Sequence, residues 1–134
     1  MARIDHRGIG HGRAGSGAYK GAYSFGSRFR DEKGTNPEEL IGAAHAGCFS
    51  MALTLGLGRA GFPPSRIHTT AKVEIEQTQD GFRITRIGLD TEVEAPGLDA
   101  SAFQAQAEAA KKDCPVSRAL TGVEVLLNAR LITG

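Results

Sequence analysis

The most pronounced hydrophobic pattern is a long apolar segment that begins at Asn36. Asn36 is a favourable N-cap, Pro37 suits the first helical position, and the two glutamates that follow complement the helix dipole. The next residues, through Leu57, are almost all apolar or small, and "RAGFPP" then supplies a glycine cap and two prolines. We predict one helix from Pro37 to Ala60, roughly 35 Å long and apolar on nearly every side.

Alternation then predicts a β-hairpin. Every second residue from Ile67 to Ile75 is apolar or threonine, with polar residues between them. "QDGF" places Asp80 and Gly81 at the turn. In the return strand the apolar positions change phase near Thr85 and Arg86, which predicts a β-bulge there.

The rest of the chain predicts shorter elements. Asp99 or Ser101 caps a second helix, a helical turn starts at Cys114 and Pro115, and a last strand alternates up to Leu131. The inward side of the second helix is expected to consist of Phe103, Ala107 and Ala110. Up to Lys33 we predict short strands and turns, with "AYSFGSRF" as a strand. The whole, residues 1–134, is expected to form one α+β domain with an antiparallel sheet.

Charge and composition narrow the classes of function. Lys plus Arg number 16 and Asp plus Glu number 15, so nothing supports a nucleic-acid or anionic-membrane surface. No segment is interpreted as long and apolar enough to cross a bilayer, and the N-terminus lacks the apolar core of a secretory signal. We therefore expect a cytoplasmic protein, in which two cysteines do not form a permanent structural disulfide.

The two cysteines are either buried small hydrophobes or redox groups. Cys114 directly precedes Pro115 at a predicted helix start, where free N–H groups stabilise a thiolate. Cys48 lies in the middle of the long helix, so it needs a nearby cation to become reactive. "SRFRDEKG", just upstream of the helix, offers Arg28 and Arg30 for that purpose.

Two segments, "EKGTNPEELIGAAHAGCFSMAL" and "CPVSRAL", strongly resemble the OsmC/Ohr family of thiol peroxidases, and its OsmC branch (osmotically inducible protein C) in particular. The resemblance implies an intertwined homodimer with antiparallel sheets wrapped around long central helices. It also implies reduction of organic hydroperoxides, and more weakly of hydrogen peroxide, without a metal or other cofactor.

The resemblance also implies roles for individual residues. Cys48 falls at the peroxidatic position and Cys114 at the resolving position, so a Cys48–Cys114 disulfide is expected in the catalytic cycle. Arg28 falls at the arginine of the site, with Arg30 as the alternative. Glu38 falls at the carboxylate that holds this arginine, and a bidentate pair is expected. An external dithiol reduces the disulfide; in the Ohr branch it is a lipoyl-bearing protein.

Two other classes of function stay open. His45 stands three residues before Cys48, so the pair would suit a cysteine hydrolase or acyl-transfer enzyme. The other possibility is a non-enzymatic dimer that binds an apolar ligand. His6, His11 and His68 have no metal-ligand spacing.

The spacing of Glu38 and Cys48 predicts a site shared by two chains. They lie ten residues apart on one predicted helix, which is roughly 15 Å along the axis. If two such helices cross antiparallel near Ala43, where the residues are small, Glu38 of one chain lands beside Cys48 of the other. The rival is a site within one chain, with the loop from Ser27 to Asn36 bridging the distance.

Overall fold

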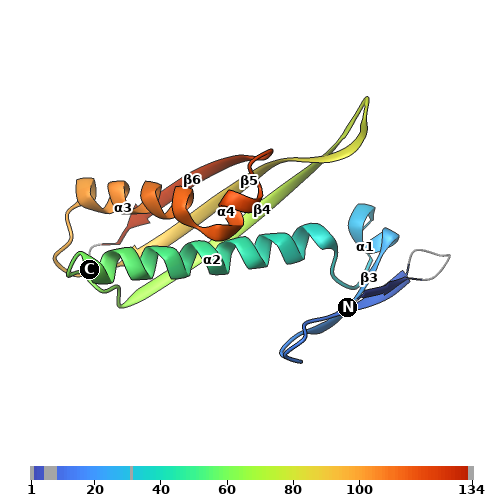
Figure 1. Ribbon diagram of the computed structural model, residues 1–134, viewed down its shortest axis with the longest axis horizontal. Coiled ribbons are helices and arrows are strands. Elements are labelled where there is room, and N and C mark those ends of the chain that lie inside the picture. Colours follow the sequence, from blue (N-terminus) through green and yellow to red (C-terminus); the bar gives the residue numbers. More distant parts are fainter. Residues whose placement is uncertain (1, 5–8, 31, 133–134) are drawn as a thin grey trace. The chain divides into compact units, whose positions relative to one another are not determined.

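A computed structural model describes residues 2–4, 9–30 and 32–132 (Figure 1). The chain divides into two compact units, Met1–Ile41 and Gly42–Gly134, and each is described by itself. The expectation of a single domain over residues 1–134 stays a prediction.

The first unit contains a three-stranded antiparallel sheet in the order β1-β2-β3. Its strands are β1 (Ala2–Ile4), β2 (Ile9–Arg13) and β3 (Lys20–Ser24). The predicted strand "AYSFGSRF" is wrong beyond Ser24, because Phe25–Phe29 forms a short helix, α1. Ser24 and Ser27 make a reciprocal capping box, each side chain accepting from the other's backbone N–H at 2.9 Å, and this local bonding outweighs the aromatic alternation.

The long helix α2 spans Pro37–Arg59, one residue shorter than predicted. Asn36 caps it as expected, accepting from the backbone N–H of Glu39 at 2.8 Å. The helix ends where Gly61 adopts a φ of 90°, a conformation that glycine takes without steric cost. The local signals in the sequence thus set both ends of the helix.

The expectation that no segment is apolar enough to cross a bilayer is wrong for α2. By length and composition α2 passes that test, with a mean hydropathy of 1.6 in its best window, because small residues and leucines follow one another without charges. The helix is also not covered on every side. Phe49, Leu53 and Leu57 are fully buried, whereas Met51 is 75% and Leu55 54% exposed.

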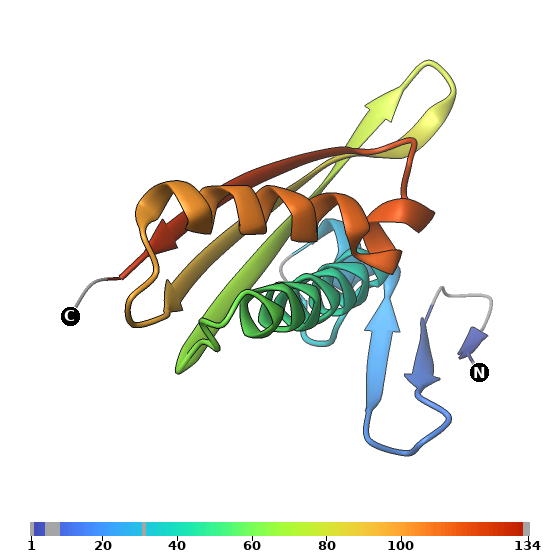
Figure 2. The same ribbon diagram turned by 60° about the vertical axis from the view of Figure 1, so that its left-hand side comes forward.

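The second unit is built on a three-stranded sheet in the order β4-β5-β6 (Figures 1 and 2). Its strands are β4 (Arg66–Thr78), β5 (Gly81–Glu94) and β6 (Glu124–Leu131). β4 and β5 form the predicted antiparallel hairpin, and Thr85 is the extra residue of the predicted bulge. The antiparallel expectation is wrong for β6, which pairs parallel to β5. The chain crosses over through two helices between these strands, so it re-enters the sheet in the same direction.

The two helices of this crossover are α3 (Ala100–Asp113) and α4 (Pro115–Ala119). Asp99 caps α3 by accepting from the backbone N–H of Ala102 at 2.8 Å. Figures 1 and 2 show α2 and α3 on the same face of the β4-β5-β6 sheet. The core of the unit lies between these layers and includes, as predicted, the inward side of α3. Its buried apolar members from the sheet and α3 are Ile87, Leu89, Val93, Phe103, Ala107 and Ala110.

Candidate active site

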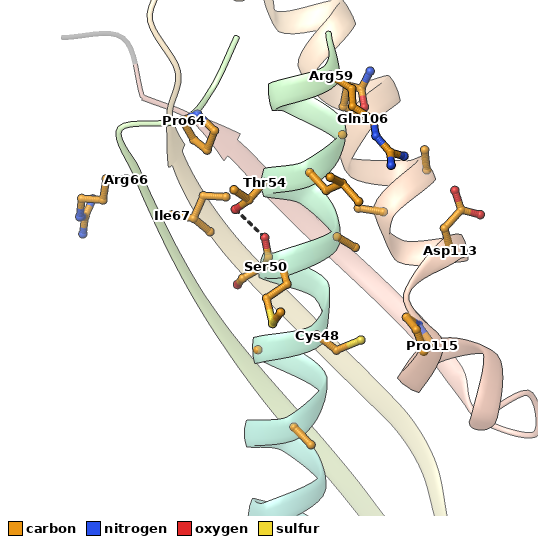
Figure 3. A pocket seen from close by; sticks show the side chains of 18 of the residues that line it. Cys48, Ser50, Thr54, Arg59, Pro64, Arg66, Ile67, Gln106, Asp113 and Pro115 are labelled. Atoms are coloured by element: carbon orange, nitrogen blue, oxygen red, sulfur yellow. Dashed lines mark hydrogen bonds between the residues drawn. The ribbon is translucent and has the colours of Figure 1, made fainter. Parts of the chain in front are cut away.

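The second unit brings the two cysteines together. Cys48 lies in the middle of α2 and is partly exposed, whereas Cys114 is fully buried at the N-cap of α4. The Cys48 thiol interacts with the Cys114 side chain and with the backbone N–H of Val116. Figure 3 shows the Cys48 side chain directed toward Pro115 at the start of α4. The two thiols therefore lie next to one another.

The surroundings of Cys48 within this unit favour the protonated thiol. Burial raises its pKa first, and the adjacent Cys114 side chain raises it further. The Val116 backbone N–H acts in the opposite direction, because it donates to the sulfur and stabilises the thiolate. A reactive thiolate at neutral pH thus needs positive charge from outside this set of contacts.

Arg28 and Glu38 form an ion pair within the first unit. The Nε and Nη2 atoms of Arg28 donate to Glu38 Oε1 at 2.9 and 2.5 Å. The expected bidentate arrangement is wrong in detail, because one carboxylate oxygen accepts both bonds. Asn36 supports the connection between the two partners by donating from its side chain to the carbonyl of Ser27 at 3.0 Å.

The burial of this pair is uneven. The Glu38 side chain is 8% exposed and the Arg28 side chain 34%, so the carboxylate is sequestered while the guanidinium keeps access to the surface. Arg28 also lies 5.5 Å from the centre of the Phe29 ring, which restricts its plane. Arg30, the alternative arginine, pairs instead with Glu32 at 3.8 Å and is 69% exposed. The geometry favours Arg28 as the arginine that Glu38 holds.

His45 bonds to a residue that the sequence patterns did not single out. Its Nε2 lies 2.7 Å from the Oγ of Ser117 on α4, and the histidine is fully buried. Burial lowers the pKa of His45. A cysteine hydrolase would need His45 to bond to the Cys48 thiol. The structure disfavours this pair because Nε2 of His45 bonds to Ser117 instead. One feature of the sequence could have indicated this contact. Ser117 follows Cys114 by three residues, and His45 precedes Cys48 by the same number.

A cavity of about 1330 Å³ opens beside Cys48. Apolar side chains of α2 and β4, including Met51, Leu55 and Ile67, form much of its wall, and Pro115 closes one side (Figure 3). Such a lining suits an organic group more than a small polar solute. In the part of the chain that the structure describes, no group of three His, Cys, Asp or Glu residues is placed to hold a metal; His6 lies outside that part.

Comparisons with known proteins agree with this geometry. Residues 30–128 match the OsmC-like protein family. The chain is 56% identical to "Peroxiredoxin OsmC" of Escherichia coli (strain K12) over 81% of its own length and 76% of the relative. It is 33% identical to "Organic hydroperoxide resistance protein OhrA" of Bacillus subtilis (strain 168) over 68% of its length and 63% of the relative.

Solved structures show the same fold. An organic hydroperoxide resistance protein from Elizabethkingia anophelis, with thiocyanate bound, superposes with a TM-score of 0.80 at 28% identity, covering 98% of this chain and 94% of the other. OhrB of Bacillus subtilis gives a TM-score of 0.75 at 27% identity, covering 97% and 95%. The chain therefore belongs to the OsmC/Ohr family and has its α+β fold.

Proposed function

We propose that this protein is a thiol-dependent peroxidase that reduces organic hydroperoxides, and hydrogen peroxide more weakly. The observation that carries the proposal is the pairing of Cys48 with Cys114 beside an apolar cavity, in a chain of the OsmC/Ohr family. The names of the relatives, peroxiredoxin and organic hydroperoxide resistance protein, describe the same chemistry in similar chains.

The reaction follows from the two thiols. The Cys48 thiolate attacks one peroxide oxygen, the O–O bond breaks, and the departing alkoxide takes up a proton to leave as an alcohol. Cys48 becomes a sulfenic acid, and the Cys114 sulfur then attacks the Cys48 sulfur. The S–O bond breaks, hydroxide leaves with the Cys114 proton as water, and a Cys48–Cys114 disulfide remains.

The Arg28–Glu38 pair supplies the positive charge that Cys48 needs. An arginine close to the sulfur favours the thiolate and stabilises the charge that develops on the departing oxygen. The buried Glu38 carboxylate holds the guanidinium in one orientation through two hydrogen bonds.

A homodimer would complete the site. Met51 and Leu55 form an exposed apolar strip on α2, which a second copy of the chain would cover. A Cβ built on Gly47 would meet no described atom within 4 Å, so packing within the described chain does not require a glycine at this position. Gly42 is different, since a Cβ there would lie 3.2 Å from the carbonyl oxygen of Ala71. We place the crossing of two antiparallel α2 helices near the exposed Ala43, because that position brings Glu38 of one chain, with its Arg28, beside Cys48 of the other.

An external dithiol closes the cycle by thiol–disulfide exchange with the Cys48–Cys114 disulfide. A lipoyl-bearing protein is the candidate, as in the Ohr branch. We propose the reducing cytoplasm as its compartment, where a dithiol can return both cysteines to thiols. No resident metal or organic cofactor is required for any step.

The test is consumption of cumene hydroperoxide with dihydrolipoamide as reductant. The wild type should turn over, Cys48→Ser should not, and hydrogen peroxide should be a poorer substrate. Parallel assays with p-nitrophenyl esters address the cysteine hydrolase. A protein that hydrolyses the esters and leaves the hydroperoxide intact would refute the peroxidase, and one that does neither would favour a non-enzymatic dimer that binds an apolar ligand.

A further inference from the structure

The short helix α4 carries the resolving cysteine but has little to hold it in place. It has five residues, none of them buried, and Cys114 as its N-cap makes no side-chain capping bond. A helix of this length has no stability of its own in water. Its position over Cys48 therefore depends on specific contacts with neighbouring elements.

The His45–Ser117 hydrogen bond is such a contact, and it runs parallel to the pair of cysteines. His45 precedes Cys48 by three residues on α2, and Ser117 follows Cys114 by three residues on α4. The two elements thus meet at two successive points, a thiol pair and a histidine–serine pair. The thiol pair changes its chemistry during turnover, whereas the second pair contains no redox-active group.

The protonation of His45 follows from its surroundings. Within the described part of the chain Nδ1 is buried and has no hydrogen-bond partner. A proton on Nδ1 would leave a buried donor unpaired, so the neutral ring with its proton on Nε2 is favoured. In that form Nε2–H donates to Ser117 Oγ, and the lowered pKa of His45 agrees with a neutral ring.

We propose that His45 and Ser117 are positioning residues that clamp α4 onto α2, so that Cys114 stays within reach of Cys48 from the thiol to the disulfide. This inference rests on the proposed function for its role in turnover. The clamp itself concerns only the geometry of the two cysteines. Loss of the bond would let α4 move away from Cys48, and a second peroxide molecule would then compete with Cys114 for the sulfenic acid.

Two variants and two controls test the clamp. Ser117→Ala removes the acceptor, and His45→Leu removes the donor. Ser117→Thr keeps the hydroxyl. Thr91→Val is the matched control, because Thr91 is fully buried and loses a comparable bond, to Thr69 Oγ1 at 2.8 Å, within the β4–β5 pair.

The first readout does not require peroxidase activity. Each protein is equilibrated in glutathione buffers of known composition, alkylated with N-ethylmaleimide, and analysed by mass spectrometry for the Cys48–Cys114 disulfide. The equilibrium constant for forming this disulfide from the dithiol and oxidised glutathione should fall about two- to tenfold in Ser117→Ala, the range expected for one lost neutral hydrogen bond. Ser117→Thr and Thr91→Val should match the wild type.

The second readout is the partition of the sulfenic acid. Without reductant, graded cumene hydroperoxide converts Cys48 to the disulfide or to the sulfinic acid, which mass spectrometry separates. The peroxide concentration for half over-oxidation should fall in Ser117→Ala and His45→Leu by a similar factor. The double variant should lose no more than either single one, since both remove the same bond.

The outcomes separate the clamp from the proposed function. A wild type that fails to reduce peroxide while its glutathione equilibrium responds to Ser117→Ala would refute the peroxidase and support the clamp. A wild type that reduces peroxide while Ser117→Ala and His45→Leu leave both readouts unchanged would overturn the clamp. An increase in the disulfide equilibrium constant would also overturn it, because the bond would then oppose the disulfide.

Discussion

Replacing Arg28 by Met removes both donors from a buried carboxylate and the positive charge that we assign to the site. Glu38 Oε1 loses its bonds to Nε and Nη2 in a side chain that is 8% exposed. Because the Arg28 side chain is 34% exposed, solvent partly compensates, and we expect a loss of about 1–3 kcal/mol in the free energy of unfolding. A second substitution, Glu38→Gln, removes the negative charge that Arg28→Met leaves without its partner, and it should restore most of this stability.

The pKa of Cys48 should respond differently. Burial and the adjacent Cys114 side chain already raise this pKa, so loss of the arginine should raise it by at least about one further unit. The thiolate, the reactive form, is present above the pKa. A higher pKa therefore moves the rise of the rate to higher pH and lowers the rate at pH 7 by about tenfold or more.

The assay is the pH dependence of Cys48 alkylation by iodoacetamide in a Cys114→Ser background, together with urea unfolding. Arg28→Met should lower stability and raise the pKa. Arg28→Met with Glu38→Gln should recover stability and keep the raised pKa, which separates an electrostatic role from a structural one. An unchanged pH profile in Arg28→Met would remove Arg28 from the site and direct attention to Arg30.

Three further predictions concern the cysteines, the dimer and the core. Cys48→Ser should abolish hydroperoxide reduction, and Cys114→Ser should keep the first turnover but over-oxidise Cys48, seen by mass spectrometry; the opposite pattern would reverse the roles. Mixing inactive Cys48→Ser and inactive Glu38→Ala subunits should restore activity if the dimers exchange, because one site of each heterodimer carries no lesion; heterodimers that form and stay inactive would refute the shared site. Phe103→Ala should cost about 3–5 kcal/mol in urea unfolding because Phe103 is fully buried, whereas Phe82→Ala at a 54% exposed position should cost far less, and equal losses would contradict this.

Local structure was predictable wherever the deciding interactions lie close in sequence. The caps at Asn36 and Asp99, the glycine end at Gly61 and the bulge at Thr85 all follow from residues within a few positions of one another. The helix at Phe25–Phe29 was missed for a related reason. Its capping box joins Ser24 and Ser27, which lie only three residues apart. The prediction followed the alternation of aromatic residues in the same segment and overlooked this pair of serines.

The predictions from sequence made larger errors where a structural feature depends on the arrangement of segments that are distant in the chain. Alternation along β6 predicts a strand but carries no direction, so its parallel pairing with β5 depends on how α3 and α4 return the chain to the sheet. The hydropathy of α2 is likewise a property of composition alone. Only the burial of Phe49, Leu53 and Leu57 within the second unit shows which side of the helix is covered within one chain.

The sequence by itself determined the family and its two cysteine motifs, because both motifs are contiguous segments whose caps and spacing can be seen in the letters. It also pointed to Arg28 and Glu38, which flank the start of the long helix. Tertiary structure decided that one oxygen of Glu38 accepts both bonds and that His45 bonds to Ser117, 72 residues away in the chain. Such contacts depend on the crossover and on side-chain orientation, and neither leaves a periodic trace in the sequence.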